Sequence, residues 1–258
     1  MIKISKKFCM AMVVISVALL IVIDIFRPAP FESSSLNDSF FIILTRLIGT
    51  ILFLIMIVYL EYDVLKAKYM FGKSALCALP CFVVAINNLP YVALILGDAH
   101  IDGTAAEIIF FALECIFVAS FEELAFRGVL FSTLMQKCGS RRQVFKAIII
   151  SSVIFGLFHL VNLIDSKNVG GVLLQVGYST LVGAMCAYVL FKTKSVWLCT
   201  AVHAIYNFCG QIVPRLGGGN MLNAPQIIIT VIIAIFCTIH IVKSILNSNF
   251  SAVNAPQT

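Results

Sequence analysis

Three short clusters place ionisable or amide side chains inside long apolar stretches of the chain. The first is the segment EELAFR at residues 122–127, the second ends at His159, and the third runs from His203 to Asn207. A charge at the centre of a bilayer costs about 2.5–3.5 kcal/mol on insertion scales, so such residues usually have a function. A carboxylate, two imidazoles and an amide can together activate water for attack on a carbonyl carbon.

The helical spacing of the first cluster separates its two carboxylates. Glu123 and Arg127 are four residues apart, so they share a helix face and can form an ion pair. Glu122 is rotated by about 100° from Glu123, because an α-helix has 3.6 residues per turn. Arg127 can therefore neutralise Glu123 while Glu122 points into a cavity. Taken alone, the cluster fits equally well a helix end whose charges are solvated at the headgroups. Glu114 has no basic neighbour in sequence and receives no role.

The two histidine clusters are each ambiguous when taken separately. His159 lies deep in an apolar run, with Phe155 one turn earlier on the same face. A lone histidine of this kind is often hydrogen-bonded to a neighbouring helix. His203 and Asn207 project from one helix face, about 6 Å apart along the axis. That spacing suits convergence on one metal ion, water molecule or oxyanion, and it also suits two interhelical hydrogen bonds.

The composition predicts that a membrane surrounds these clusters. The 258 residues are 61% hydrophobic and 12% charged, and the mean hydropathy is +1.04. A soluble domain has about 25% charged residues, and a bilayer core about 30 Å thick needs about 20 helical residues per crossing. We therefore predict an all-α, polytopic membrane helix bundle with about eight transmembrane helices. Their expected ranges are 8–26, 40–61, 74–97, 105–134, 144–164, 170–191, 196–213 and 225–246. Asn87, Asn88 and Pro90 predict a kink in the third.

The distribution of basic residues predicts the orientation. With the N-terminus inside, thirteen lysines and arginines fall on inner segments; four fall on outer segments and their flanks, namely Arg27, Arg46, Lys167 and Arg215. Cytoplasmic loops carry such an excess, so both termini are expected inside. Counting along the helices places Glu122 and His203 about 9–10 Å from the cytoplasmic edge, and His159 deeper, at about 18 Å.

No polar linker or repeat divides the chain, so residues 1–258 are expected to form a single membrane-embedded domain with its core motifs within 105–213. The net charge of +6 is scattered between apolar runs and forms no stripe, which argues against nucleic acid as a partner. The nine cysteines are odd in number and scattered, so free thiols are expected in place of a disulfide framework.

The ordered set E-E-x-x-x-R, F-x-x-x-H and H-x-x-x-N resembles the CPBP intramembrane proteases. This family comprises CAAX proteases and bacteriocin-processing enzymes and is also known as Abi. The resemblance covers residues 122–207 and extends to the eight-span layout. It implies an intramembrane endopeptidase in which Glu122 is the water-activating base and His159, His203 and Asn207 complete the site.

The same resemblance implies that Glu123 and Arg127 support the site, Arg127 by pairing. It leaves the cofactor open. His159 and His203, with Glu122 or Asn207, could hold zinc in a metalloprotease, and the motif also fits a glutamate-activated water without metal. The sequence does not distinguish these two mechanisms.

The expected substrate is a membrane-associated peptide or protein, and the lipid bilayer is the other partner. The family suggests either prenylated C-terminal peptides of the CAAX type or bacterial peptides such as bacteriocin and signal-peptide precursors, with bacteriocin self-immunity as a related role. An Ile- and Lys-rich, multi-pass chain favours a bacterial cell membrane.

The alternative function is a non-catalytic immunity or scaffold protein whose polar clusters only join helices. A transporter would need more polar residues outside the three clusters.

Overall fold

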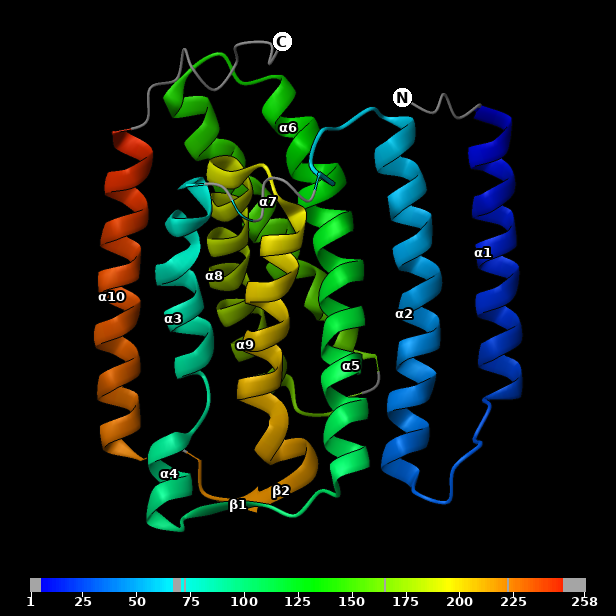
Figure 1. Ribbon diagram of the computed structural model, residues 1–258, viewed down its shortest axis with the longest axis vertical. Coiled ribbons are helices and arrows are strands. Elements are labelled where there is room, and N and C mark those ends of the chain that lie inside the picture. Colours follow the sequence, from blue (N-terminus) through cyan, green and yellow to red (C-terminus); the bar gives the residue numbers. More distant parts are fainter. Residues whose placement is uncertain (1–5, 67–70, 72, 165, 222, 248–258) are drawn as a thin grey trace.

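The computed structural model describes residues 6–66, 71, 73–164, 166–221 and 223–247. Over these residues the prediction of an all-α fold is confirmed (Figure 1). The α-helices are α1 (Lys6–Phe26), α2 (Ser34–Tyr59), α3 (Leu79–Asn87), α4 (Tyr91–Leu96), α5 (Ala105–Glu123), α6 (Ser132–Gln136), α7 (Arg141–Phe158), α8 (Val169–Thr193), α9 (Val196–Leu216) and α10 (Ala224–Leu246). The 3₁₀-helices η2 (Lys73–Ala78) and η4 (His159–Leu163), the π-helix η3 (Leu124–Phe131), and the strands β1 (Ala99–Ile101) and β2 (Gly217–Gly219) complete the described elements.

Helices occupy all eight ranges in which membrane spans were predicted. In the described part of the chain, six are long and apolar enough to cross a bilayer: 34–59, 75–96, 141–163, 169–193, 196–216 and 224–246. The other two predicted spans coincide with α1 and with the continuous run of α5, η3 and α6, which carries the site carboxylates. α1 begins and α10 ends at the same end of the bundle, as an even number of crossings requires (Figure 1). The number eight and the inside location of the termini stay predictions.

The outer helices present large apolar side chains to their surroundings. Ile228 and Phe236 on α10 are 58% and 70% exposed, and Leu174 on α8 is 71% exposed. Contiguous exposure of this kind is rare on a soluble monomer and is expected where lipid replaces water. The bundle centre lies instead at α9 and the second half of α8, where Cys186, Ala187, Tyr188, Val189, Val196, Cys199 and Val202 are fully buried. The eight cysteines whose side chains are described are free, as predicted.

The predicted kink in the third span is present, and it separates α3 from α4. The backbone carbonyl groups freed by this break receive hydrogen bonds from the Gln226 side chain, at 3.1 Å for Asn87 and 3.3 Å for Leu89. The Asn88 amide in turn donates to the Tyr206 carbonyl at 2.9 Å. A broken helix is tolerated in a membrane when neighbouring helices satisfy its free backbone groups in this way.

Two local features fix α5 against its neighbours. Thr104 and Glu107 form a reciprocal capping box, with the Glu107 N–H donating to the Thr104 hydroxyl at 3.3 Å and the Thr104 N–H donating to the Glu107 carboxylate at 3.0 Å. The Ser33 hydroxyl at the start of α2 also donates to Glu107, at 2.7 Å. These bonds set where α5 begins, and therefore which face of it Glu122 occupies.

A second link joins the two helices that carry the first and third clusters. β1 precedes α5 and β2 follows α9, and the two strands pair antiparallel, with Ala99 opposite Gly219. A Cβ atom on Gly217 would collide with the His100 carbonyl oxygen, so this close backbone approach requires glycine. The strand pair therefore ties the N-terminal end of α5 to the C-terminal end of α9.

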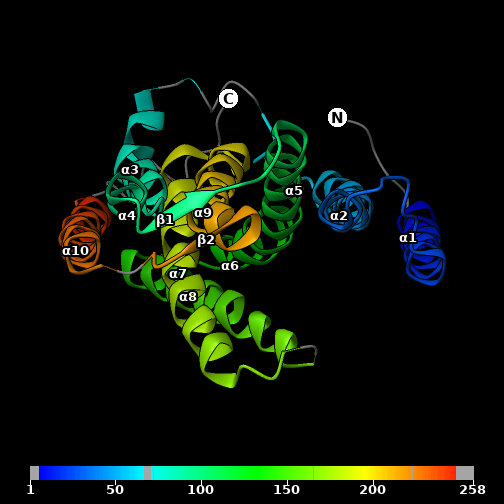
Figure 2. The ribbon, with the colours of Figure 1, turned by 90° about the horizontal axis from the view of Figure 1, so that it is seen from below.

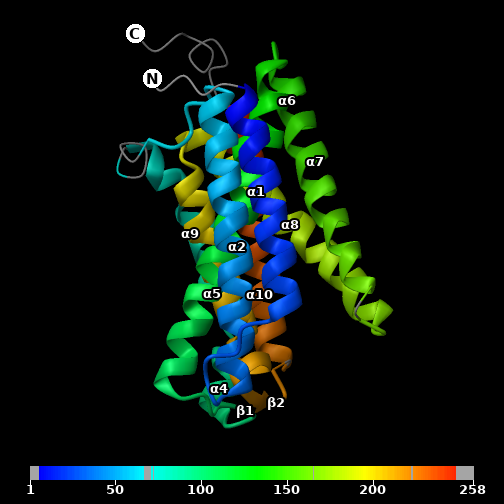
Figure 3. The same cartoon turned by 90° about the vertical axis from the view of Figure 1, so that its right-hand side faces the viewer.

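The α7–α8 hairpin leans away from the other helices. Figure 3 shows α7 inclined relative to α2 and α5, and Figure 2 shows the hairpin projecting from the central α9. Gly156 allows this pair to pack closely, because a Cβ atom there would overlap the Thr180 hydroxyl oxygen. The inclination matters for the histidine at the end of α7.

Candidate active site

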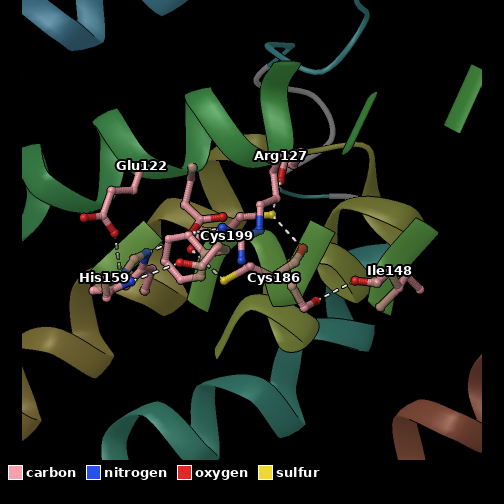
Figure 4. Close-up of polar contacts among 11 residues, drawn as sticks. Glu122, Arg127, Ile148, His159, Cys186 and Cys199 are labelled. Atoms are coloured by element: carbon pink, nitrogen blue, oxygen red, sulfur yellow. Dashed lines mark hydrogen bonds and ion pairs between the residues drawn. The ribbon is translucent and has the colours of Figure 1, made fainter. Parts of the chain in front are cut away.

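A cavity of about 350 Å³ brings the three sequence clusters together. It is bounded by α2, α5, α7, η4, α8 and α9, and Glu122, His159, His203 and Asn207 all line it. Aromatic side chains form much of the remaining wall, namely Phe155, Phe158, Tyr178 and Tyr206. Figure 4 shows Glu122 and His159 directed into the same space from two different helices.

Glu123 and Arg127 lie behind this cavity as a fully buried ion pair. The Arg127 Nη1 donates to Glu123 Oε1 at 3.0 Å, and both side chains are 0% exposed, so the pairing predicted from their spacing occurs. The guanidinium also stacks on the Phe155 ring, 4.3 Å from its centroid. Gly183 on α8 provides the room, because a Cβ atom there would lie 3.1 Å from Arg127 Nη2.

The ion pair starts at the last residue of α5 and continues into the π-helix η3. A π-helical turn is wider than an α-helical turn and occurs frequently at functional sites. Glu122, one residue earlier, faces the cavity, while Glu123 is completely buried. The adjacent carboxylates therefore occupy different environments, one lining the cavity and the other enclosed by protein.

His203 connects the two carboxylates. Its Nδ1 lies 2.8 Å from Glu123 Oε1, and its Nε2 lies 3.7 Å from Glu122 Oε2. The Glu123 carboxylate, ionised against Arg127, can only accept a hydrogen bond, so Nδ1 carries the proton. In the neutral ring Nε2 then presents a lone pair toward Glu122. A separation of 3.7 Å exceeds a direct hydrogen bond and suits a bridging water molecule.

His159 is oriented in the same way by a backbone group. It follows directly after α7, and its Nδ1 lies 3.0 Å from the Phe155 carbonyl oxygen. Since a carbonyl only accepts, Nδ1 is the donor and Nε2 is left unprotonated in the neutral ring. The Phe155 ring makes edge contacts with both imidazoles, with centroids 5.1 Å from His159 and 5.7 Å from His203.

Counting residues along an upright helix placed His159 deeper than Glu122 and His203. The structure nevertheless places all three side chains on one cavity. The inclination of α7 (Figure 3) is the physical reason, since residues along a tilted helix descend less steeply through the bilayer. Asn207 lines the same cavity one turn after His203, and its side-chain amide makes no hydrogen bond with other described residues.

Metal binding places a stricter demand on the same side chains. Histidines that ligate metal usually have the second ring nitrogen held by a carboxylate or carbonyl group, as both imidazoles have here. Among the described residues, however, no three His, Cys, Asp or Glu side chains converge closely enough to hold a metal ion. As placed, these side chains do not form a zinc site, and both alternatives drawn from the sequence, bound zinc and a water held without metal, stay predictions.

Two charged residues of the cavity, Glu114 and Arg46, were not recognised as such from sequence. Glu114 lines the cavity, accepts a hydrogen bond from Ser39 at 2.6 Å and pairs with Arg215 at 3.5 Å, although it had been given no role. Arg46 also lines the cavity, which its grouping with the basic residues of the outer segments and flanks did not indicate. The partners lie on other helices, far away in sequence. The available signal was their position inside or beside apolar runs.

Fold and site together define a polytopic membrane helix bundle with carboxylate, histidine and asparagine side chains around one cavity. Residues 104–209 match the family model described as type II CAAX prenyl endopeptidase Rce1-like. This matched segment covers less than half of the chain, and it contains every member of the three motifs that resemble the CPBP/CAAX protease family. The resemblance drawn from those motifs is thereby confirmed. No curated protein and no solved structure matches the chain.

Proposed function

We propose that this protein is an intramembrane endopeptidase that hydrolyses a peptide bond of a membrane-associated peptide or protein with water activated by Glu122. The position of Glu122 carries the proposal. Its carboxylate lines the cavity 3.7 Å from His203 Nε2, within a segment that matches a protease family. We place the whole chain as one domain in a cell membrane.

The proposed reaction uses the neutral tautomers of the two histidines. A water molecule donates one proton to Glu122 and its other hydrogen bond to the Nε2 of an imidazole, so that an oxygen lone pair is free for attack. As the oxygen bonds to the substrate carbonyl carbon, Glu122 takes the proton. The Asn207 amide stabilises the oxyanion that develops. The proton then passes from Glu122 to the leaving nitrogen, and the C–N bond breaks to give a carboxylic acid and an amine.

Glu123 and Arg127 act in this scheme through His203. Glu123 holds the proton on Nδ1, which keeps Nε2 available as an acceptor, and Arg127 is the buried counter-ion of Glu123. An imidazole with an unheld Nδ1 could adopt the other tautomer and would then donate toward Glu122. The buried ion pair is thus a positioning device for one ring nitrogen.

The family description, which names a CAAX prenyl endopeptidase, supports a proposal for the substrate class. We propose a prenylated C-terminal peptide as the substrate, with precursors of bacteriocins or signalling peptides as the second candidate. The cavity volume is at the small end of the range for ligand sites, about 300–1,000 Å³, and suits a short peptide segment.

The test compares purified wild-type protein with Glu122→Gln in detergent micelles, with a fluorogenic farnesylated C-A-A-X peptide as substrate. Glutamine preserves the shape and removes the base, so we expect cleavage to fall by a factor of about 10²–10⁴. Glu32→Gln, which changes an exposed carboxylate at the start of the α2 region, is the matched control and should retain full activity. Undiminished cleavage by Glu122→Gln would refute the mechanism. A scaffold protein would keep its cellular phenotype in this variant.

A further inference from the structure

Arg46 is a charged residue of the cavity to which the proposed reaction assigns no task. It lies in the middle of α2 and lines the cavity together with Glu122. Its guanidinium carbon lies 5.2 Å from the centroid of the Phe121 ring. The Nε atom is buried and has no hydrogen-bond acceptor among the described residues. The aromatic ring holds the guanidinium plane, but it does not satisfy its donors.

The carboxylates around the cavity already have partners. Glu114 accepts from Ser39 and pairs with Arg215, and Glu122 faces His203. No described carboxylate lies within ion-pair distance of Arg46. An unpaired cation within an apolar helix bundle is costly, and such residues generally face a cavity that receives a charged ligand. Arg46 therefore has no counter-anion among the described residues, and the cavity it lines is open to an anionic group of a ligand.

The contacts between α2 and α5 define the height of Arg46 in the cavity. Ser39 bonds to Glu114, and Gly49 packs against Phe121, so Arg46 lies between these two levels. It is therefore about one helical turn from Glu122 along the bundle, on the wall formed by the neighbouring helix. A ligand group bound by Arg46 would belong to the same molecule that reaches Glu122, because both residues line one cavity.

We propose that Arg46 binds a carboxylate of the peptide substrate, an inference that rests on the proposed protease function. A guanidinium presents a planar fork of donors that matches a carboxylate in two parallel hydrogen bonds. In a C-A-A-X sequence the terminal carboxylate lies three residues beyond the prenylated cysteine, or about 10 Å in an extended chain. A C-terminal carboxylate is thus close enough to the reacting bond to share its cavity. An acidic side chain near the cleaved bond would offer the same chemistry.

Binding of short peptides tests this without requiring cleavage. The probes are the tripeptide Val-Ile-Met as the free acid, Val-Ile-Met with an amidated C-terminus, and amidated Val-Asp-Met. Their dissociation constants would be measured on purified full-length wild type, Arg46→Gln and Arg46→Lys. Arg142→Gln, which removes an exposed charge on α7, is the matched control.

For the wild type we expect the free acid to bind about 10- to 100-fold more tightly than its amide, as a charge-assisted hydrogen bond implies. Arg46→Gln should lose this preference while still binding the amide as the wild type does. Arg46→Lys should retain part of it, and Arg142→Gln all of it. Tight binding of amidated Val-Asp-Met that depends on Arg46 would identify a side-chain carboxylate as the ligand.

Four results would overturn the proposal. They are equal binding of acid and amide to the wild type, a preference that persists in Arg46→Gln, an equal loss of affinity for acid and amide in Arg46→Gln, and no binding of any probe. Failure of the proposed protease function can be distinguished from failure of this proposal. It would appear as absent cleavage of the farnesylated peptide and does not depend on how the tripeptides bind.

Discussion

Replacing Arg127 by methionine should expose how strongly the buried ion pair holds the site together. The substitution leaves the Glu123 carboxylate fully buried without its counter-ion, while the His203 Nδ1 remains as a hydrogen-bond donor. Removing one partner of a buried pair costs about 3–5 kcal/mol, because the other charge remains uncompensated. We therefore expect the free energy of unfolding to fall by that amount in Arg127→Met.

The double variant separates the charge effect from the loss of packing. In Glu123→Gln/Arg127→Met both charges are gone, and replacing a whole buried pair by neutral groups is often nearly neutral. We expect it to recover about 2 kcal/mol or more of the stability lost in Arg127→Met, since residues in one network couple by about 0.5–3 kcal/mol. Its protease activity should stay low, because His203 has lost the carboxylate that orients it.

Equilibrium unfolding of the purified proteins in mixed detergent micelles would measure these differences. Lys66→Met is the control, since Lys66 pairs with Asp63 at 2.9 Å on an exposed surface and should contribute about 0–1 kcal/mol. The single variant Glu123→Gln completes the cycle. If the stability losses of Glu123→Gln and Arg127→Met added up to that of the double variant within about 0.5 kcal/mol, the pair would not be coupled and the reasoning would be refuted.

Three further expectations follow from the same geometry. Asn207→Ala should lower kcat by a factor of about 10²–10³ with little change in KM, because the amide acts on the oxyanion; a change confined to KM would place it in substrate binding. Because the described side chains offer no set of three converging ligands, dialysis against a chelator should leave cleavage intact, and a loss that zinc restores would contradict this. Gly156→Ala should destabilise the α7–α8 pair by about 1–3 kcal/mol through overpacking. Gly177→Ala, which meets open space, should stabilise it by about 0.5–1 kcal/mol, and equal effects of the two on unfolding would refute the packing argument.

Features that depend on neighbouring residues in one helix could be predicted from the sequence. The pairing of Glu123 with Arg127, and the different direction of Glu122, follow from the helical period alone. The break between α3 and α4 was predicted from Asn87, Asn88 and Pro90. The convergence of His159 and His203 on Glu122 has no such local basis, and only the resemblance of the ordered motifs to a family indicated it.

Features that depend on packing between helices were missed or misjudged. Arg46 and Glu114 were not recognised as cavity residues, because their contacts come from helices distant in sequence. Residue counting along upright helices did not show that His159 would share a cavity with Glu122 and His203, which it does on the inclined α7 (Figure 3). The His203 contact with Glu123, which fixes the ring tautomer, joins residues 80 positions apart and has no sequence signature of its own.

The most direct test of the central claim is a single turnover of the farnesylated peptide in H₂¹⁸O, followed by mass spectrometry of the newly formed carboxyl group. If Glu122 activates water, the first product formed should contain one ¹⁸O atom, and Glu122 should remain unlabelled. A first product without ¹⁸O, together with label in the Glu122 carboxylate, would show that Glu122 attacks the substrate directly and would contradict the account.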